Sequence, residues 1–132
     1  NLFIEGYAYP PAQDWLNPSN DNLWQGINGI NNPCPTGFRL PTLAEFTAEI
    51  AAFPEQNSTG AYSSVLKLPV AGRRLLGPSL IEGGSVGYYW ISSVSTANPN
   101  TAQVVLINQT EARIDGSTPR TEGFCVRCIK NQ

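Results

Sequence analysis

The clearest periodic pattern along the chain is helical and lies in its first half. Apolar side chains recur on one helical face at Leu43, Phe46, Ile50 and Phe53. Just before this run, Thr42 and Glu45 have the spacing of a capping box, in which each side chain binds a free backbone amide at the helix start. Pro54 cannot continue the pattern. The sequence therefore predicts one helix that begins after Thr42, ends before Pro54 and packs its apolar face on a sheet.

Short apolar or alternating runs predict the strands of that sheet. They are Ser64–Gly72, Tyr88–Val94, Ala102–Asn108, Ala112–Asp115 and Phe124–Ile129. Asn108–Glu111 has turn composition and predicts a hairpin. The segment from Asn17 to Asn32 is dense in Asn, Asp, Pro and Gly, and predicts a long loop anchored by Trp15 and Trp24. One main helix, short strands and long loops predict an α+β fold with a small mixed or antiparallel sheet.

The chain has three cysteines, which is an odd number. Cys34 lies between two prolines, in a rigid turn suited to directing its side chain inward. In an extended final strand, Cys128 shares a face with Phe124 and Val126, whereas Cys125 points the other way. This phase predicts a disulfide between Cys34 and Cys128 with Cys125 free; two buried free thiols are the alternative. A disulfide would place the domain in an oxidising, extracellular setting.

Composition narrows the classes of function. The 132 residues fit a single domain, 1–132, which we expect to be the terminal domain of a longer protein. Charged residues make up 14% of the chain and the net charge is −2, so nucleic acid is not an expected partner. Membrane insertion is not expected either, because no apolar run approaches the roughly 18 residues that a membrane span needs. The chain has no histidine and no acidic cluster with calcium-loop spacing. We therefore expect no catalytic residue, no metal and no cofactor.

The late strands predict a surface of mixed chemistry. Strand alternation places Val105, Ile107, Ala112 and Ile114 on the core side. The opposite side carries Val104, Leu106, Asn108, Glu111, Arg113 and Asp115. Similar mixtures occur at Arg73, Arg74, Leu75 and Leu76, and at Ile81, Glu82 and Val86. Apolar side chains beside both charges make a poor core and a good recognition surface, so these three groups are the candidate ligand-binding residues, called the mixed face. Alternatively, their apolar members are buried under loops, and the Trp15–Trp24 loop is the next candidate.

Four motifs, in order, carry a resemblance to a known family. They are NDNLWQGINGINNPCPTGFRLPT, LKLPVAG, GYYWISS and the terminal GFCVRCIK. Across residues 14–130 the chain resembles the Fibrobacter succinogenes major paralogous domain family of bacterial secreted proteins, and particularly its branch of variable target proteins of diversity-generating retroelements. The resemblance implies a C-type lectin fold, a small α+β domain whose two ends meet and whose ligand face is built on late strands and loops.

Together these features predict a non-enzymatic ligand-binding module for adhesion or receptor recognition. We expect it to be extracellular, whether secreted, on a cell surface or on a phage particle such as a phage tail. The expected ligand is a cell-surface protein or a carbohydrate, and any homo-oligomer would form through the parent protein. The main alternative is a structural domain of a surface filament or virion whose mixed face makes subunit contacts. An enzyme related to sulfatase-modifying formylglycine synthases, which share the fold, is a more distant alternative.

Overall fold

A computed structural model of the chain describes residues 14, 16, 18–75, 79–96, 98 and 101–131. The elements in chain order are β1 (Phe38–Arg39), α1 (Leu43–Ala51), α2 (Ser58–Ser63), β2 (Arg73–Arg74), β3 (Leu80–Ile81), β4 (Gly87–Val94), β5 (Thr101–Ile107), β6 (Ala112–Pro119) and β7 (Ile129–Lys130). Short helices and small antiparallel sheets make this an α+β fold, as predicted. Over the described residues, no helix combines the length and apolar character needed to cross a membrane.

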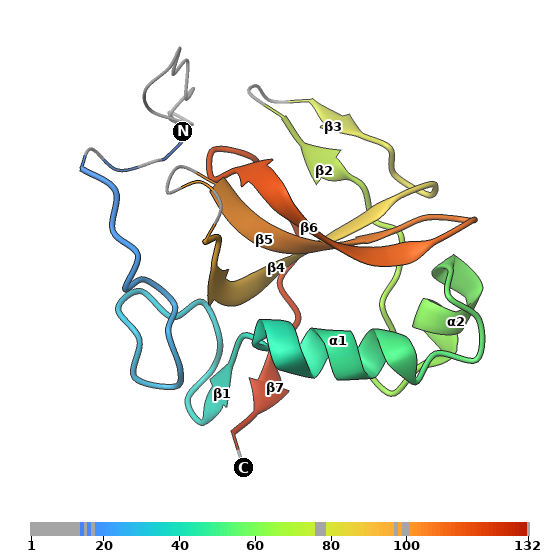
Figure 1. The fold of residues 1–132 in the computed structure, drawn as a ribbon, viewed down its shortest axis with the longest axis horizontal. Coiled ribbons are helices and arrows are strands. Elements are labelled where there is room, and N and C mark those ends of the chain that lie inside the picture. Colours follow the sequence, from blue (N-terminus) through green and yellow to red (C-terminus); the bar gives the residue numbers. More distant parts are fainter. Residues whose placement is uncertain are drawn as a thin grey trace.

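The main core lies between α1 and one face of a three-stranded antiparallel sheet with the order β4-β5-β6 (Figure 1). The sheet contributes Tyr89, Ile91, Val105 and Ile107, and the helix with its C-terminal end contributes Phe46, Ile50 and Phe53. Ala112 and Ile114 of β6 pack against the same cluster. The predicted helix and the predicted core side of the strands are thus confirmed. Because side chains alternate along a strand, the residues between these point to the opposite face, away from α1.

The start of α1 is fixed by its predicted capping box and by a neighbouring arginine. The Thr42 side chain accepts a hydrogen bond from the Glu45 amide, and the Glu45 carboxylate accepts one from the Thr42 amide at 2.8 Å. Arg39 of β1 holds the same carboxylate with two hydrogen bonds of 2.7 Å each. The bidentate contact with Arg39 lowers the pKa of Glu45 to about 2. Glu45 therefore links the helix start to β1 as a carboxylate at neutral pH.

The hairpin between β5 and β6 is confirmed. Asn108 Oδ1 accepts hydrogen bonds from the Thr110 and Glu111 amides at 2.8 and 2.9 Å, so the asparagine side chain closes the turn. Leu106 lies opposite Arg113 in the resulting register. β6 then runs to Pro119, beyond the predicted end at Asp115.

The predicted strand at Ser64–Gly72 is wrong. This segment is irregular, and the helix α2 precedes it where no element was predicted. Asn57 caps α2 by accepting hydrogen bonds from the Thr59 and Gly60 amides. The helix has only six residues and no apolar periodicity, so the hydrophobic pattern does not indicate it. The apolar side chain of Leu68 enters the core from an irregular segment instead of a strand.

The disulfide between Cys34 and Cys128 is confirmed, with Cys125 as a free cysteine. Near this bond, β1 and β7 pair antiparallel, so an early turn and the end of the described chain lie together (Figure 1).

The predicted strand Phe124–Ile129 is wrong over most of its length. Cys125 makes a single bridge with Tyr89, and regular pairing begins only at Ile129. Strict alternation fails there: Val126 is exposed and Cys125 packs against the main core.

Candidate ligand-binding face and pocket

Tyr88 is the point at which two parts of the mixed face meet. Across the sheet, Tyr88 is paired with Leu106, and Leu106 is paired with Arg113. These side chains form a row on the sheet face opposite α1, because the neighbouring Tyr89 and Val105 belong to the α1 core. Leu106 is half-buried and Arg113 is exposed. Tyr88 is only 7% exposed, because Phe124 stacks on its ring with 5.0 Å between centroids, so Leu106 and Arg113 are the accessible members of the row.

The β2–β3 hairpin adds a second cation to this row. The guanidinium carbon of Arg73 lies 4.7 Å from the centroid of the Tyr88 ring, within the range of a cation–π contact. Arg73 also forms ion pairs with Glu82 at 2.8 Å and with Glu122 at 3.1 Å. Ile81 lies opposite Arg73 in the strand pair. Two carboxylates and one ring therefore hold Arg73 in place before any ligand arrives.

Burial shifts the proton affinities around Arg73. It raises the pKa of Glu122, and the positive charge of Arg73 opposes that shift. It also raises the pKa of Tyr88, again against the effect of Arg73. Burial acts to lower the pKa of Arg73, but Tyr88, Glu122 and Glu82 together raise it. Arg73 is therefore a permanent cation next to a tyrosine that keeps its proton at neutral pH.

A second charged group lies on β6. Arg113 pairs with Glu111 at 3.3 Å and with Asp115 at 3.0 Å. The hydroxyl and amide of Ser117 bind Asp115 and lower its pKa, with a further contribution from Arg113. Exposed pairs of this kind add at most about 1 kcal/mol to stability, so their main effect is on the chemistry of the surface.

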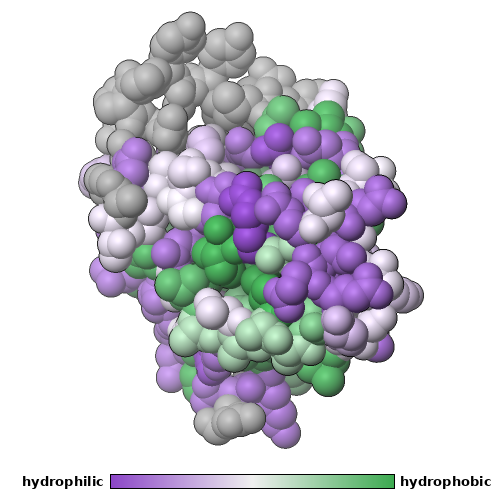
Figure 2. Space-filling view, turned by 45° about the vertical axis from the view of Figure 1, so that its right-hand side comes forward, coloured by the Kyte–Doolittle hydropathy of each residue, from purple (hydrophilic) through white to green (hydrophobic). Residues whose placement is uncertain are grey.

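Figure 2 brings the end of the molecule with α2 and the β5–β6 hairpin forward, and there apolar groups lie directly between polar ones.

Val104 is a correction to the predicted mixed face. The strand phase was right, since Val104 points away from α1, but its side chain is 0% exposed. It packs with Leu40 and Trp90 in a second cluster, against which Trp24 and Phe124 also pack. The early loop and the C-terminal segment thus cover this end of the second sheet face. For Val104 the alternative interpretation, burial under loops, is the correct one.

The other members of the mixed face take various positions. Arg74 ends β2 and the exposed Leu75 follows it, while the half-buried Val86 precedes β4. Asn108 forms the hairpin turn described above. Leu76 lies outside the described residues. The structure therefore joins Arg73, Leu106 and Arg113 through Tyr88, with the remaining residues around them.

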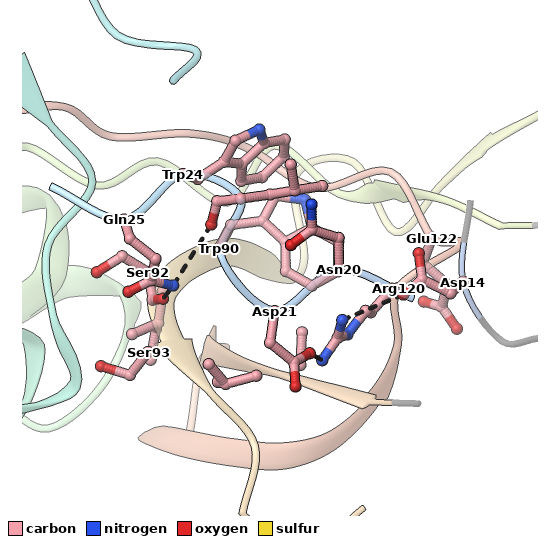
Figure 3. A pocket seen from close by; sticks show the side chains of 14 residues that line it. Asp14, Asn20, Asp21, Trp24, Gln25, Trp90, Ser92, Ser93, Arg120 and Glu122 are labelled. Atoms are coloured by element: carbon pink, nitrogen blue, oxygen red, sulfur yellow. Dashed lines mark hydrogen bonds and ion pairs between the residues drawn. The ribbon is translucent and has the colours of Figure 1, made fainter. Parts of the chain in front are cut away.

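A pocket of about 180 Å³ lies beside the mixed face, between the early loop and β4 (Figure 3). The indoles of Trp24 and Trp90 lie close together on one side of the view. Arg120 lies on another side and forms ion pairs with Asp14 at 3.1 Å and with Asp21. Glu122 also lines the pocket and, through Arg73, connects it to the mixed face.

Hydrogen bonds from the backbone and from one side chain hold the loop that forms one wall of this pocket. The Trp24 amide donates to the Ile30 carbonyl at 3.0 Å, and the Gln25 side-chain amide donates to the Ser92 carbonyl. Trp24 has a φ of 61°, a left-handed conformation that is rare for a bulky aromatic residue. Such a conformation persists only where the surroundings enforce it. The loop therefore fixes the backbone of Trp24, and its side chain packs against the cluster of Leu40, Trp90 and Val104.

Four residues of the site were not predicted from the sequence: Tyr88, Trp90, Arg120 and Glu122. Tyr88 and Trp90 belong to an apolar run that is typical of a buried strand, and that pattern does not indicate that Tyr88 contacts Arg73 or that Trp90 lines the pocket. Arg120 contacts Asp14 and Asp21 across sequence separations of 106 and 99 residues, which no local pattern reveals. The loop from Trp15 to Trp24 was the predicted second candidate, and Trp24 does line the pocket; Trp15 lies outside the described residues.

Comparison of the chain with protein-family models, with curated proteins and with solved structures found no match.

We expect a chelator to leave the thermal midpoint of this domain unchanged. Asp14 and Asp21 are the loop acids that could bind calcium, but Arg120 already engages Asp14 Oδ2 and Asp21 Oδ1, so these two oxygens cannot both serve as direct calcium ligands. Among the described residues, no three His, Cys, Asp or Glu side chains are grouped for metal binding. Thermal unfolding in EDTA and in added calcium would check this. A midpoint several degrees lower in EDTA, restored by calcium, would contradict it.

Proposed function

We propose that this domain is a non-enzymatic ligand-recognition module that captures a protein or glycan on another surface. The observation that supports this best is the row formed by Tyr88, Leu106 and Arg113, with Arg73 fixed over the ring of Tyr88. Tyrosine and arginine are among the side chains that contribute most binding energy at protein interfaces. Their fixed arrangement reduces the entropy that a binding partner must overcome.

We further propose that the fold is of the C-type lectin type. Support comes from three features: the pairing of β1 with β7, the disulfide beside that pair, and a sheet that carries α1 on one face and the candidate ligand face on the other. The disulfide also supports an extracellular location, because such bonds persist in oxidising compartments.

Replacing Leu106 and Arg113 together by alanine should weaken ligand binding while the domain stays folded. Each side chain is at least partly exposed, and truncating a central interface residue typically costs more than about 1 kcal/mol. The double variant should therefore lose about tenfold or more in affinity. The measurement is binding of the wild-type domain to glycan and cell-surface protein arrays, followed by titration of each variant against the ligand found.

A matched control removes one aliphatic and one cationic side chain elsewhere. Val65 is 87% exposed and Lys130 is also exposed, and neither belongs to the mixed face. Val65→Ala with Lys130→Ala should bind as the wild type does. The proposal fails if neither array yields a ligand, or if the Leu106 and Arg113 variant binds as tightly as the control.

A further inference from the structure

The pocket between Trp24 and Arg120 has the size of a single small ligand. Its volume is about 180 Å³. An apolar protein cavity of roughly 150 Å³ is large enough for one benzene molecule. The pocket can therefore hold one ring or one compact branched group, and not an extended chain.

The walls are mostly apolar and their aromatic groups are fixed. Besides the two indoles, the lining includes Leu23, Val94 and Ala102. Trp90 packs on Phe124 with 4.5 Å between ring centroids, and its amide donates to the Cys125 carbonyl at 3.0 Å. The loop bonds described above hold the backbone of Trp24, whose half-buried indole is the more accessible of the two because Trp90 is only 7% exposed. Fixed indole rings provide the best aromatic surface for a cation, because the face of the ring carries negative charge.

The polar part of the pocket has more negative than positive groups. Asp14, Asp21 and Glu122 supply three carboxylates, against one guanidinium, that of Arg120, among the described lining residues. Arg120 directs Nη1 to Asp14, Nη2 to Asp21 and Nε to the Thr101 carbonyl. All three nitrogens of its guanidinium are thus engaged, which leaves it poorly suited to bind an anionic ligand.

Asp21 is the carboxylate best placed to meet a ligand. Its side chain is 55% exposed, whereas that of Asp14 is only 7% exposed. Its ion pair with Arg120 uses Oδ1. Glu122 is less available, because burial raises its pKa and Arg73 already binds it. A ligand in the pocket would therefore lie between the two indoles and the Asp21 carboxylate.

We propose that this pocket binds an alkylated ammonium group. A quaternary ammonium has the required compact shape, an apolar surface that suits indole rings, and a positive charge that attracts Asp21. The same group occurs in free choline-like compounds and in methylated lysine side chains of proteins, so the chemistry is shared by two sources. This second site is independent of whatever ligand the mixed face binds.

The first test is a fluorescence titration of the wild-type domain with choline chloride, using its tryptophan emission. Choline should give a saturable change, and 3,3-dimethylbutan-1-ol, which has the same shape without the charge, should bind at least tenfold more weakly. Sodium chloride at matched ionic strength corrects for salt. The proposal is overturned if choline gives no saturable change, if the neutral analogue binds equally well, or if methyl glucosides bind in its place.

Variants then locate the binding to the pocket. Asp21→Asn keeps the shape of the side chain and should weaken choline binding severalfold, and Trp24→Leu should abolish it. Glu55→Gln, which removes an exposed carboxylate outside both the pocket and the mixed face, should bind as the wild type does. Thermal midpoints check that each variant is folded. The assignment is refuted if Asp21→Asn and Trp24→Leu bind choline as tightly as the wild type does. The affinity for acetylated trimethyllysine amide is then compared with the affinity for choline. Tighter binding of the lysine derivative indicates a protein side chain as the ligand, and tighter binding of choline indicates a free small molecule.

Discussion

Replacing Val104 by aspartate should unfold this domain or lower its stability by several kcal/mol. The Val104 side chain is 0% exposed and is surrounded by Leu40, Trp90 and neighbouring apolar groups. A carboxylate at this position would be buried without a partner, which is among the most costly changes a core can undergo. Denaturant unfolding of the purified variant, followed by circular dichroism, measures the loss.

The same substitution at Leu106 is the matched control. Leu106 is two residues further along β5, points to the same side of the sheet and is only half-buried. Its Cα partner Arg113 offers a positive charge at the surface. Leu106→Asp should therefore remain folded, at a cost of about 1–2 kcal/mol, because the new carboxylate at this half-buried position can still reach water. Equal tolerance of aspartate at both positions would show that the second apolar cluster does not contribute as described.

Removing the disulfide should have an effect of similar size. Cys34 and Cys128 are 94 residues apart, and closing a loop of that length stabilises the folded state by about 4–5 kcal/mol in the chain-entropy model. For a domain of 132 residues this corresponds to a fall of roughly 10–20 °C in the thermal midpoint. Calorimetry of a variant with both cysteines replaced by alanine would measure it.

Cys125→Ala provides the comparison for the disulfide experiment. Cys125 is free and only partly buried against the main core, so its truncation should cost no more than about 1 kcal/mol. A midpoint that falls equally in both variants would mean that packing around the sulfur atoms, and not the covalent bond, supplies the stability.

Local signals allowed the sequence to predict α1 and the β5–β6 hairpin. The capping box at Thr42 and the turn at Asn108 are satisfied by residues only two or three positions away, so the pattern contains both partners. The disulfide was predictable because a cysteine in a turn and a cysteine near the C-terminal end left few pairings. α2 was missed because its six residues have neither periodicity nor a strong apolar content.

The candidate site was predictable only in part, since strand phase indicates direction and not exposure. Val104 and Leu106 have the same phase and differ because the early loop and Phe124 cover only one of them. The pocket depends even more on distant partners. Arg120 has no distinctive neighbours in the sequence, and its ion pairs with Asp14 and Asp21 arise from the way the early loop folds back on the sheet.

The bond between Cys34 and Cys128 also determines how the domain would respond to mechanical force. A pull on the segment after Cys128 is transmitted directly to Cys34 through the two sulfur atoms and bypasses the chain between them. The 94-residue separation could otherwise extend by about 300 Å, at roughly 3.3–3.6 Å per residue. The Tyr88 row lies inside this closed loop, whereas Asp21 and Trp24 of the pocket precede Cys34 and stay in the path of the force. A contact made through the Tyr88 row would therefore rest on a sheet that the disulfide keeps from being pulled apart.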